Sequence, residues 1–169
     1  MRGLASGDAI RSSSSATAAS PISNAGYRPQ PVGNVLVHPL APVPPGARRI
    51  RVDLADLPDL RDDVRALARS YGVSERRIDD LVLATNELAS NTVRHGGGDG
   101  RVEIWVRDGS IWCEVADSGR LDDPFVGRRR PKSTDIGGRG VWIAHQVCDL
   151  VQVRSGPDGT RVRIRMAIT

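Results

Sequence analysis

The sequence has few aromatic residues, few cysteines and no long apolar run. Aromatic residues make up 4% of its 169 residues, so a folded core has to be mainly aliphatic. No apolar stretch approaches the ~18–20 residues of a membrane-spanning helix, which argues against a membrane protein. The two cysteines, Cys113 and Cys148, lack metal-ligand spacing and form no CxxC motif. A disulfide framework and a structural zinc site are therefore not expected.

Lysine is nearly absent as well, and positive charge is only in modest excess. Lys132 is the only lysine among 24 basic residues, and the net charge is +4. No stretch forms a basic helix with interleaved aromatic residues, the pattern typical of nucleic-acid binding. The N-terminal region also lacks the apolar segment of a secretory signal. We therefore expect a cytoplasmic protein with no nucleic-acid or membrane partner.

Residues 1–46 differ in composition from the rest of the chain. They hold seven serines, seven prolines, seven alanines and five glycines, but only four charged residues. A segment of this kind buries too little apolar surface to offset the entropy lost when it becomes ordered. The sequence predicts a disordered tail over residues 1–46 and one folded domain over residues 47–169.

Hydrophobic periodicity after the tail predicts a strand, two helices, a hairpin, a third helix and a second hairpin. Apolar residues alternate in the strands and recur every three or four residues in the helices. The expected strands are near 48–54, 101–107, 110–116, 150–154 and 160–168, and the expected helices are near 57–71, 75–94 and 138–148. This order predicts an α+β fold, a two-layer α/β sandwich. Its mixed, mostly antiparallel sheet would have helices on one face.

The longest predicted helix carries a carboxylate and a carboxamide one turn apart. Glu87 and Asn91 are at positions i and i+4, about 40° apart around the helix axis, and Arg94 flanks them on the same side. This row of three different polar groups is one interpretation of a binding surface. A solvent-exposed helix face with an i,i+4 hydrogen bond is the alternative.

Two later segments combine glycine with polar residues. Asp117-Ser118-Gly119-Arg120 follows a predicted strand, and a turn is the simplest interpretation of that segment alone. Gly138-Arg139-Gly140 opens the last helix, where backbone N–H groups and the helix dipole can hold an anion. The segment lacks the Gly-Lys-Ser/Thr of a P-loop and the spacing of a dinucleotide-binding motif. An ordinary loop-to-helix junction is the alternative.

Together, the three segments resemble the N, G1 and G2 boxes of the Bergerat-fold ATPases, the GHKL superfamily. Box content, order and intervening strands agree over about residues 48–168, and the closer likeness is to the anti-sigma factor serine kinases of the SpoIIAB and RsbW type. The segment Glu87–Gly96 resembles their N-box, and Gly159-Thr160 resembles their final Gly-Thr. One departure is Leu121, which stands where the family's Asp-x-Gly-x-Gly usually has its second glycine.

The resemblance implies a role for each polar residue of the long helix. Asn91 would bind Mg²⁺ that bridges the phosphates, since an amide oxygen suits a hard cation. Glu87 would act as general base toward a water molecule or a serine hydroxyl. Arg94 is placed where it could contact a phosphate.

The other two segments are implied to hold the nucleotide. Asp117 would accept a hydrogen bond from the adenine amino group, Gly119 would leave room for the ring, and Thr160 would help to hold the base. The Gly138-Arg139-Gly140 segment would present backbone N–H groups to the phosphates. ATP and Mg²⁺ are therefore the expected cofactors.

As a function, the resemblance implies a Mg-ATP-dependent serine/threonine kinase of the anti-sigma factor class. Its expected substrate is a STAS-type anti-sigma factor antagonist, its second partner is a sigma factor, and it is expected to be a homodimer. One alternative, favoured by Leu121, is a catalytically weak or inactive ATP-binding regulatory module that acts by protein contacts. Another is a basic interaction protein without a nucleotide. A histidine autokinase is disfavoured, because no histidine lies in a phosphoacceptor context.

A basic run, Arg128-Arg129-Arg130-Pro131-Lys132, lies just before the last predicted helix. One interpretation is a lid in which one arginine closes on the γ-phosphate while the others meet an acidic partner. A solvated run of charge is the alternative.

The sheet face away from the helices is expected to carry paired side chains. The Asp108-Gly109 turn sets Trp105 opposite Trp112 and Glu103 opposite Glu114. Neighbouring arginines would pair with the two glutamates and stack on the indoles. The composition predicts a homodimer or partner interface at Trp105 and Trp112, and a self-satisfied solvent face is the alternative.

Overall fold

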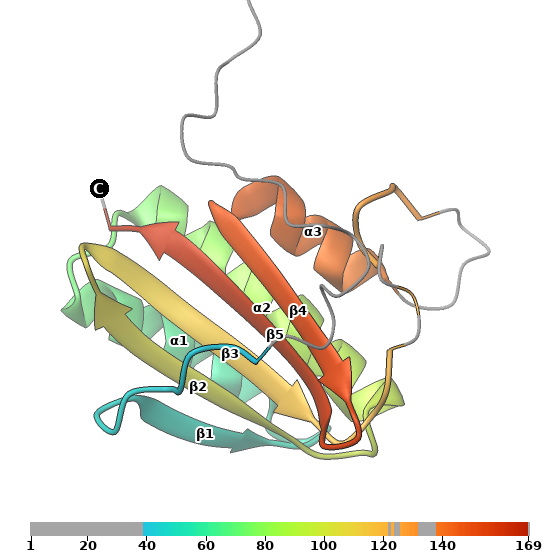
Figure 1. Ribbon diagram of the computed structural model, residues 1–169. Helices are drawn as coiled ribbons and strands as arrows, with labels where there is room; N and C mark the ends of the chain where they lie inside the picture. Colours follow the sequence, from blue (N-terminus) through green and yellow to red (C-terminus); the bar gives the residue numbers. More distant parts are fainter. Residues whose placement is uncertain (1–38, 122, 124–125, 132–137, 169) are drawn as a thin grey trace, which may run out of the picture.

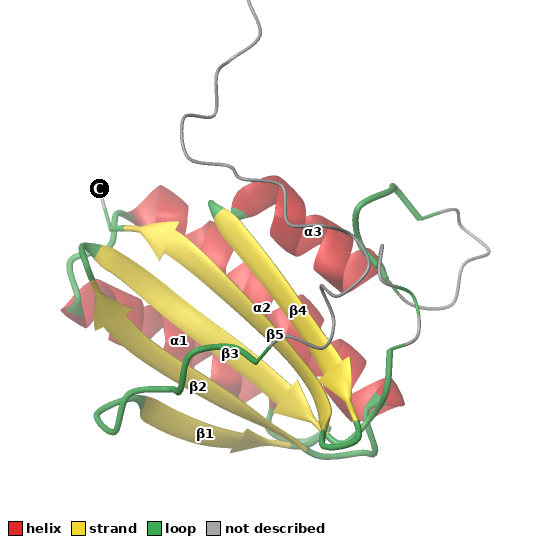
Figure 2. Ribbon diagram, in the orientation of Figure 1, coloured by secondary structure: helices red, strands yellow, loops and turns green. Residues whose placement is uncertain are grey.

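In the part of the chain that the structure describes, five strands form one antiparallel sheet, and three helices pack on one of its faces (Figure 1). The structure is a computed structural model in which residues 39–121, 123, 126–131 and 138–168 are described. Its elements, in chain order, are β1 (Arg48–Val52), α1 (Leu57–Ser70), α2 (Glu75–His95), β2 (Gly100–Arg107), β3 (Ser110–Asp117), α3 (Arg139–Val147), β4 (Leu150–Gly156) and β5 (Gly159–Ala167). Figure 2 shows the two layers of the predicted α+β sandwich, which is confirmed.

The sheet order is β1-β2-β3-β5-β4, and all four strand pairs are antiparallel. The expectation of a mixed sheet is therefore refined to an antiparallel one. The β3–β5 pairing places the end of β3 beside the start of β5, so that Asp117 lies opposite Thr160. Gly138, at the start of α3, lines the same cavity as Asn91, Asp117 and Thr160, so the three predicted boxes converge at this end of the sheet.

The inner face of the sheet carries the aliphatic core that the composition predicts. Residues that alternate along β2, β3 and β5 point at the helices and are buried: Val102, Ile104, Ile111, Cys113, Val115, Val162, Ile164 and Met166. Burial raises the pKa of the Cys113 thiol to about 12, so this cysteine acts as a small apolar core residue. Cys113 and Cys148 are both free thiols, as expected.

The N-cap positions of α1 and α2 hold residue types that often cap helices. Asp56 and Ser74 occupy the N-cap positions of α1 and α2, yet neither of these described side chains makes a capping hydrogen bond. Asp53 takes over part of this task, since its carboxylate accepts hydrogen bonds from the backbone N–H groups of Ala55 and Asp56. The entry to α1 is therefore held by the turn before it.

The turn between β2 and β3 has the geometry that its sequence predicts. Asp108 has a φ of 50° and Gly109 has a φ of 65°, both in the left-handed region that a tight hairpin turn of this type requires. The turn fixes the register, with Trp105 opposite Trp112. The two indoles are stacked, with ring centroids 6.1 Å apart and planes 7° from parallel.

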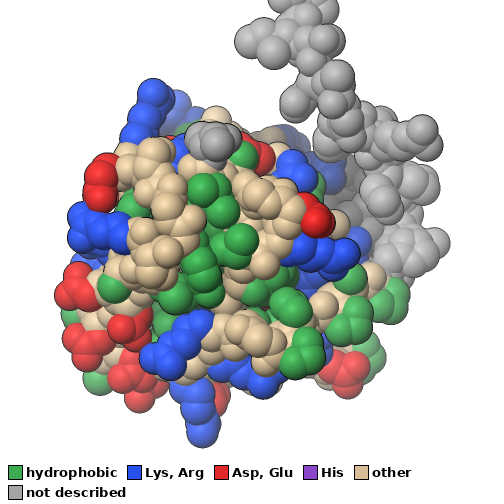
Figure 3. Space-filling view, turned by 90° about the vertical axis from the view of Figure 1, so that its left-hand side faces the viewer, with side chains coloured by type: hydrophobic (Ala, Val, Ile, Leu, Met, Phe, Trp, Pro, Cys, Tyr) green, Lys and Arg blue, Asp and Glu red, His purple; other side chains and the backbone are tan. Residues whose placement is uncertain are grey.

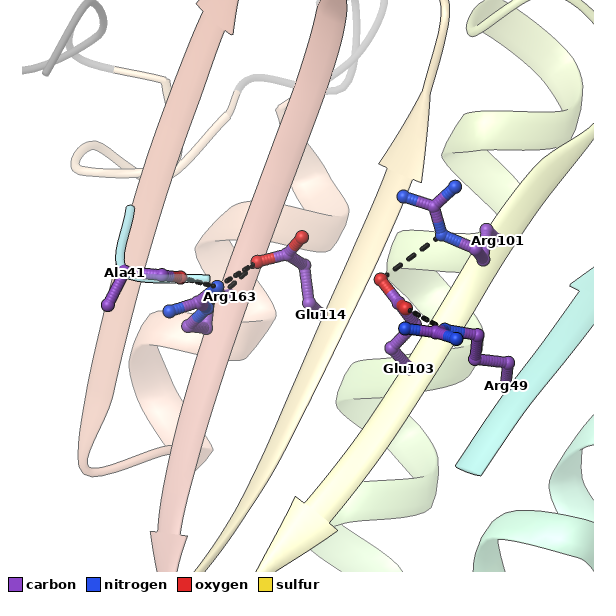
Figure 4. A network of polar contacts seen from close by, with 6 residues as sticks. All are labelled: Ala41, Arg49, Arg101, Glu103, Glu114 and Arg163. Atoms are coloured by element: carbon purple, nitrogen blue, oxygen red, sulfur yellow. Dashed lines mark hydrogen bonds and ion pairs between the residues drawn. The ribbon is translucent and has the colours of Figure 1, made fainter. Parts of the chain in front are cut away.

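The outer face of the sheet carries a row of charged side chains (Figure 4). Arg163 on β5 donates through Nε to Glu114 on β3 at 2.8 Å and lies over the Trp105 ring at 5.1 Å. Glu103 on β2 is held by Arg49 at 2.7 Å and by Arg101 at 3.1 Å. The expected pairing of glutamates with arginines is therefore confirmed.

Part of this charged row is buried. Glu114 is 1% exposed and Trp105 is 5% exposed, whereas the Arg49 and Arg101 side chains are 58% and 47% exposed. The alternative of a self-satisfied solvent face stays open. The described residues before β1 cross this face in front of the sheet (Figure 1), and the Ala41 carbonyl accepts a hydrogen bond from Arg163 at 2.8 Å. The predicted disordered tail at residues 1–46 lies largely outside the described residues. A homodimer or partner interface at the Trp pair stays a prediction.

The surface at the β2–β3 turn side of the molecule mixes charges of both signs. Figure 3 shows Arg, Asp and Glu side chains interspersed around hydrophobic ones, with acidic side chains gathered along one lower edge. On this side, a continuous basic surface of the kind that nucleic acids require is not seen. Within the part of the chain that the structure describes, no helix is long and apolar enough to cross a bilayer.

Candidate functional site

A cavity of about 260 Å³ opens between α2, α3 and the adjoining ends of β3 and β5. Residues from all three predicted segments line it, including Asn91 from α2, Asp117 and Gly119 from the end of β3, and Gly138 from the start of α3. Thr160 of β5 completes this polar group. Segments that are far apart in the sequence therefore contribute to one site.

The walls of the cavity are apolar. They are formed by Leu88, Val115, Leu121, Val126, Val141 and Val162. A mostly apolar lining with a few polar groups is typical of small-molecule sites, and it suits a flat ring. Leu121, the departure from the family pattern, packs against the core as part of this wall.

Asp117 is the carboxylate of the cavity, and two donors clamp it. The Thr92 hydroxyl donates to its Oδ2 atom at 2.8 Å, and the Gly119 backbone N–H donates to its Oδ1 atom at 2.8 Å. Burial raises the pKa of Asp117 above its ordinary value, while these two hydrogen bonds act in the opposite direction. Gly96 leaves space for the carboxylate, because a Cβ atom there would collide with it.

Thr160 belongs to a chain of hydrogen bonds. The Leu121 N–H donates to Ser155 Oγ at 2.8 Å, the Ser155 and Thr160 hydroxyls are 2.9 Å apart, and Thr160 donates to the Gly119 carbonyl at 2.9 Å. Since Thr160 has one hydroxyl proton and gives it to Gly119, Ser155 has to donate to Thr160. Thr160 therefore offers the cavity only an acceptor.

Gly140 brings the start of α3 against the polar row of α2. A Cβ atom at Gly140 would collide with Asn91 Nδ2 and would lie 2.9 Å from the Glu87 carbonyl oxygen. Asn91 lines the cavity and is only partly exposed. Asn91 is thus more than a solvent-exposed residue of the helix face, whereas Arg94 of the same row is exposed.

The start of α3 has the geometry of a loop-to-helix junction with a glycine cap. Gly138 is left-handed, with a φ of 77°, and its carbonyl accepts from the Trp142 N–H at 2.9 Å. The first N–H groups of a helix have no partner within that helix, and they carry the positive end of its dipole. Because Gly138 also lines the cavity, an anion there would meet this positive end.

A comparison with protein families agrees with this geometry. Residues 50–166 match the family described as the histidine kinase-like ATPase domain. The chain belongs to that family. As an ATPase domain, it has an ATP-binding fold, and the cavity between α2 and α3 is the candidate nucleotide site of that fold.

One solved structure shows the same fold as this ATPase domain, and others are similar to it in part. The RsbU and RsbW domains of Rv1364c from Mycobacterium tuberculosis match with 19% identity and a TM-score of 0.54, over 76% of this chain. This chain covers 33% of that one, a third of its length. The catalytic domain of the histidine kinase ThkA has 12% identity and a TM-score of 0.47, with 72% and 97% of the two chains covered. No curated protein matches the chain.

A blue-light activated histidine kinase from Erythrobacter litoralis also matches through its histidine kinase domain. The identity is 18% and the TM-score is 0.43, with 68% of this chain and 60% of that chain covered.

Four predicted site residues lie beside the cavity of the ATPase domain rather than in it. Among the described lining residues, Glu87, Arg94, Arg139 and Gly140 are absent. Arg94 and Arg139 are exposed, whereas Glu87 is half-buried one turn before Asn91. Phosphate contacts by Arg94 and Arg139 remain predictions.

The arginine run before α3 packs partly on α3. Arg130 lies over the Trp142 ring, 5.8 Å from its centroid, and Lys132 falls outside the described residues. Burial lowers the pKa of His145 on α3, and the nearby Arg128 lowers it further. Arg130 therefore lies beside α3, while Arg128, Arg129 and Arg130 are all exposed. The lid and the solvated run both stay predictions.

Two residues of the polar network were not singled out by sequence reasoning. Thr92 directly follows Asn91 on α2, and Ser155 precedes the last turn. The partner of Thr92 is Asp117, 25 residues later in the sequence. The partner of Ser155 is Thr160, on the other strand of a hairpin. A hydroxyl residue at a buried position of α2 was the available signal, because a buried hydroxyl usually has a hydrogen-bond partner.

Proposed function

We propose that the protein binds Mg-ATP in this cavity and acts as a regulatory serine/threonine kinase of the anti-sigma factor class. The observation that carries the proposal is the convergence of Asn91, Asp117 and Gly138 on one cavity of a histidine kinase-like ATPase domain. The remaining residues support particular parts of it.

The adenine end of the nucleotide fits the part of the cavity near Asp117. Its carboxylate accepts hydrogen bonds, and the amino group of adenine donates them. The apolar walls formed by Val115 and Val162, among others, suit the faces of the ring. At the other end, Gly138 and the start of α3 suit the negative phosphates.

Magnesium fits only in the presence of the nucleotide. The described residues contain no cluster of three or more His, Cys, Asp or Glu side chains that could hold a metal ion. Asn91 supplies one amide oxygen, so the other ligands would have to come from phosphates and water, as is common for Mg²⁺. When bound, the ion would neutralise phosphate charge.

Phosphoryl transfer needs mainly positioning and charge stabilisation. Glu87, half-buried one turn before Asn91 on α2, is the proposed general base for a serine hydroxyl. The proposed substrate is a serine of a STAS-type anti-sigma factor antagonist, and the second partner is a sigma factor. The sequence resemblance to anti-sigma factor kinases supports these partners, a homodimer and a cytoplasmic location.

A catalytically weak or inactive ATP-binding module is the second candidate. Two observations favour it: Leu121 forms part of the cavity wall, and Glu87 is absent from the described lining residues. Such a module would bind the nucleotide and regulate its partners by contact alone.

Two assays separate these functions. Titration of the full chain with a fluorescent ATP analogue, with and without Mg²⁺, tests nucleotide binding, and no binding would exclude both candidates. Transfer of radiolabelled γ-phosphate to a purified STAS-type antagonist tests the kinase. ATP binding without phosphate transfer would exclude the kinase and support the regulatory module. Sedimentation of the full chain at rising concentration tests the homodimer, which a persistent monomer would contradict.

A further inference from the structure

We propose that Thr92 is a positioning residue that orients the Asp117 carboxylate and so sets a preference of the site for 6-amino purines over 6-oxo purines. The proposal rests on the proposed nucleotide site. It adds Thr92, a residue that the family resemblance does not place in contact with the nucleotide. Thr92 lies on α2, lines the cavity and is 4% exposed.

The Thr92 side chain makes one contact through its hydroxyl group and another through its methyl group. Its hydroxyl donates to Asp117 Oδ2 at 2.8 Å. Its methyl group packs so closely against Gly100, at the start of β2, that a Cβ atom there would collide with it. The methyl group therefore fills the space beside Gly100, and the hydroxyl group is the part of the side chain that reaches Asp117.

The Asp117 carboxylate is consequently held at both oxygens. Gly119 holds Oδ1 through its backbone N–H, and Thr92 holds Oδ2. A carboxylate has about four acceptor positions, so each oxygen keeps one for a ligand. Removing the Thr92 hydroxyl would release one oxygen and leave only the Gly119 bond to orient the group.

The direction of these hydrogen bonds determines what the cavity can recognise. The Thr92 proton goes to Asp117, and the Thr160 proton goes to the Gly119 carbonyl. Asp117 and Thr160 can therefore only accept from a ligand. A 6-amino purine presents a donor at this edge, whereas a 6-oxo purine presents an acceptor that would face the carboxylate.

The Thr92 bond also affects the protonation of Asp117. Burial raises the pKa of Asp117, and the Thr92 bond opposes that effect. Loss of the bond would raise the pKa further. Since the ionised carboxylate is the stronger acceptor for an amino group, ATP binding would then weaken at a higher pH as the solution is acidified.

Other charged groups near Asp117 would be the same in every variant. His95 and Arg120 line the same cavity. On its other side, Asp117 borders a shallow recess lined by Arg51, Asp99, Arg101, Asp158 and Arg161. The phosphates of ATP also titrate. The informative quantity is thus the difference between variant and wild-type pH profiles, in which these contributions cancel.

The experiment uses the full chain with three substitutions. Thr92→Val keeps the shape and removes the hydroxyl, while Thr92→Ser keeps the hydroxyl. The matched control is Thr85→Val, because Thr85 is a fully buried threonine on the same helix whose hydroxyl contacts Cys113 Sγ at 3.6 Å, away from the cavity. Binding of ATP and of inosine triphosphate (ITP) is measured from pH 4 to pH 8, about the range in which a shifted carboxyl group titrates.

For Thr92→Val we expect about tenfold weaker ATP binding, a smaller ATP-to-ITP affinity ratio and an acid limb moved to higher pH. Thr92→Ser should bind like the wild type, and Thr85→Val should change only the unfolding midpoint. Equal affinity, selectivity and pH profile in wild type and Thr92→Val would overturn the proposal while the nucleotide site stands. Identical losses in Thr92→Ser and Thr92→Val would overturn it too. A wild type that binds no ATP would overturn the proposed function itself.

Discussion

Gly140, in the first turn of α3, packs directly against Asn91 of α2, with no room for a Cβ atom between them. The same glycine lies close to the Glu87 backbone carbonyl. The absence of a side chain thus lets the start of α3 approach the polar row of α2. This contact joins the predicted metal-binding residue to the predicted phosphate-binding segment.

Substitution of Gly140 should therefore disturb the site. In Gly140→Ala, the new methyl group would push Asn91 or α3 aside, and we expect ATP affinity to fall about tenfold or more. Fluorescent ATP analogue titration measures this. Gly46→Ala is the matched control, since a Cβ atom at Gly46 meets nothing within 4 Å. Similar affinities in both variants would contradict the packing argument.

Asn91→Ala should remove the Mg²⁺ dependence of ATP binding. The substitution deletes the one amide oxygen proposed as a protein ligand, while α2 should stay folded because alanine favours helices. ATP titrations with and without Mg²⁺ test this, and circular dichroism checks the fold. If Mg²⁺ strengthens ATP binding equally in wild type and variant, Asn91 does not hold the ion.

Glu87→Gln should separate binding from chemistry. Glutamine keeps the shape of the side chain but is not a base, so transfer of γ-phosphate should fall by roughly 10²–10⁴-fold. ATP affinity should change little, because the described cavity lining does not include Glu87. A variant that phosphorylates the antagonist at the wild-type rate would show that Glu87 is not the base.

The arginine run should respond to the γ-phosphate if it acts as a lid. Arg130 lies over Trp142 on α3, so closure would have to change this contact. We expect trypsin to cleave after Arg128 and Arg129 more slowly with ATP than with ADP or no nucleotide. Equal cleavage in all three conditions would contradict the lid and support the interpretation as a solvated run of charge.

The buried pair of Glu114 and Arg163 should make the outer face sensitive to single substitutions. Arg163→Met leaves a buried carboxylate without its partner, which should lower the free energy of unfolding by about 3–5 kcal/mol. Adding Glu114→Leu removes the unpaired charge and should restore most of that loss. Urea unfolding measures both. If the double variant loses as much free energy of unfolding as the two single variants lose together, Glu114 and Arg163 do not stabilise each other.

Local signals in the sequence determined most of the fold. The period of apolar residues located every strand and helix, because one face of each element has to be buried. Asp108-Gly109 determined the register of Trp105 and Trp112, since the two-residue turn leaves one pairing for the residues beside it. The order of the elements and the three boxes then sufficed to indicate the family.

The tertiary structure alone decided which side chains hold the site residues. Thr92 meets Asp117, Ser155 meets Thr160, and Arg163 meets Glu114 and the Ala41 carbonyl. It also placed Arg130 on Trp142 and the segment before β1 on the outer face. Periodicity reports only whether a residue faces the core. The identity of a hydrogen-bond partner depends on how distant elements are brought together, so it is absent from any local pattern.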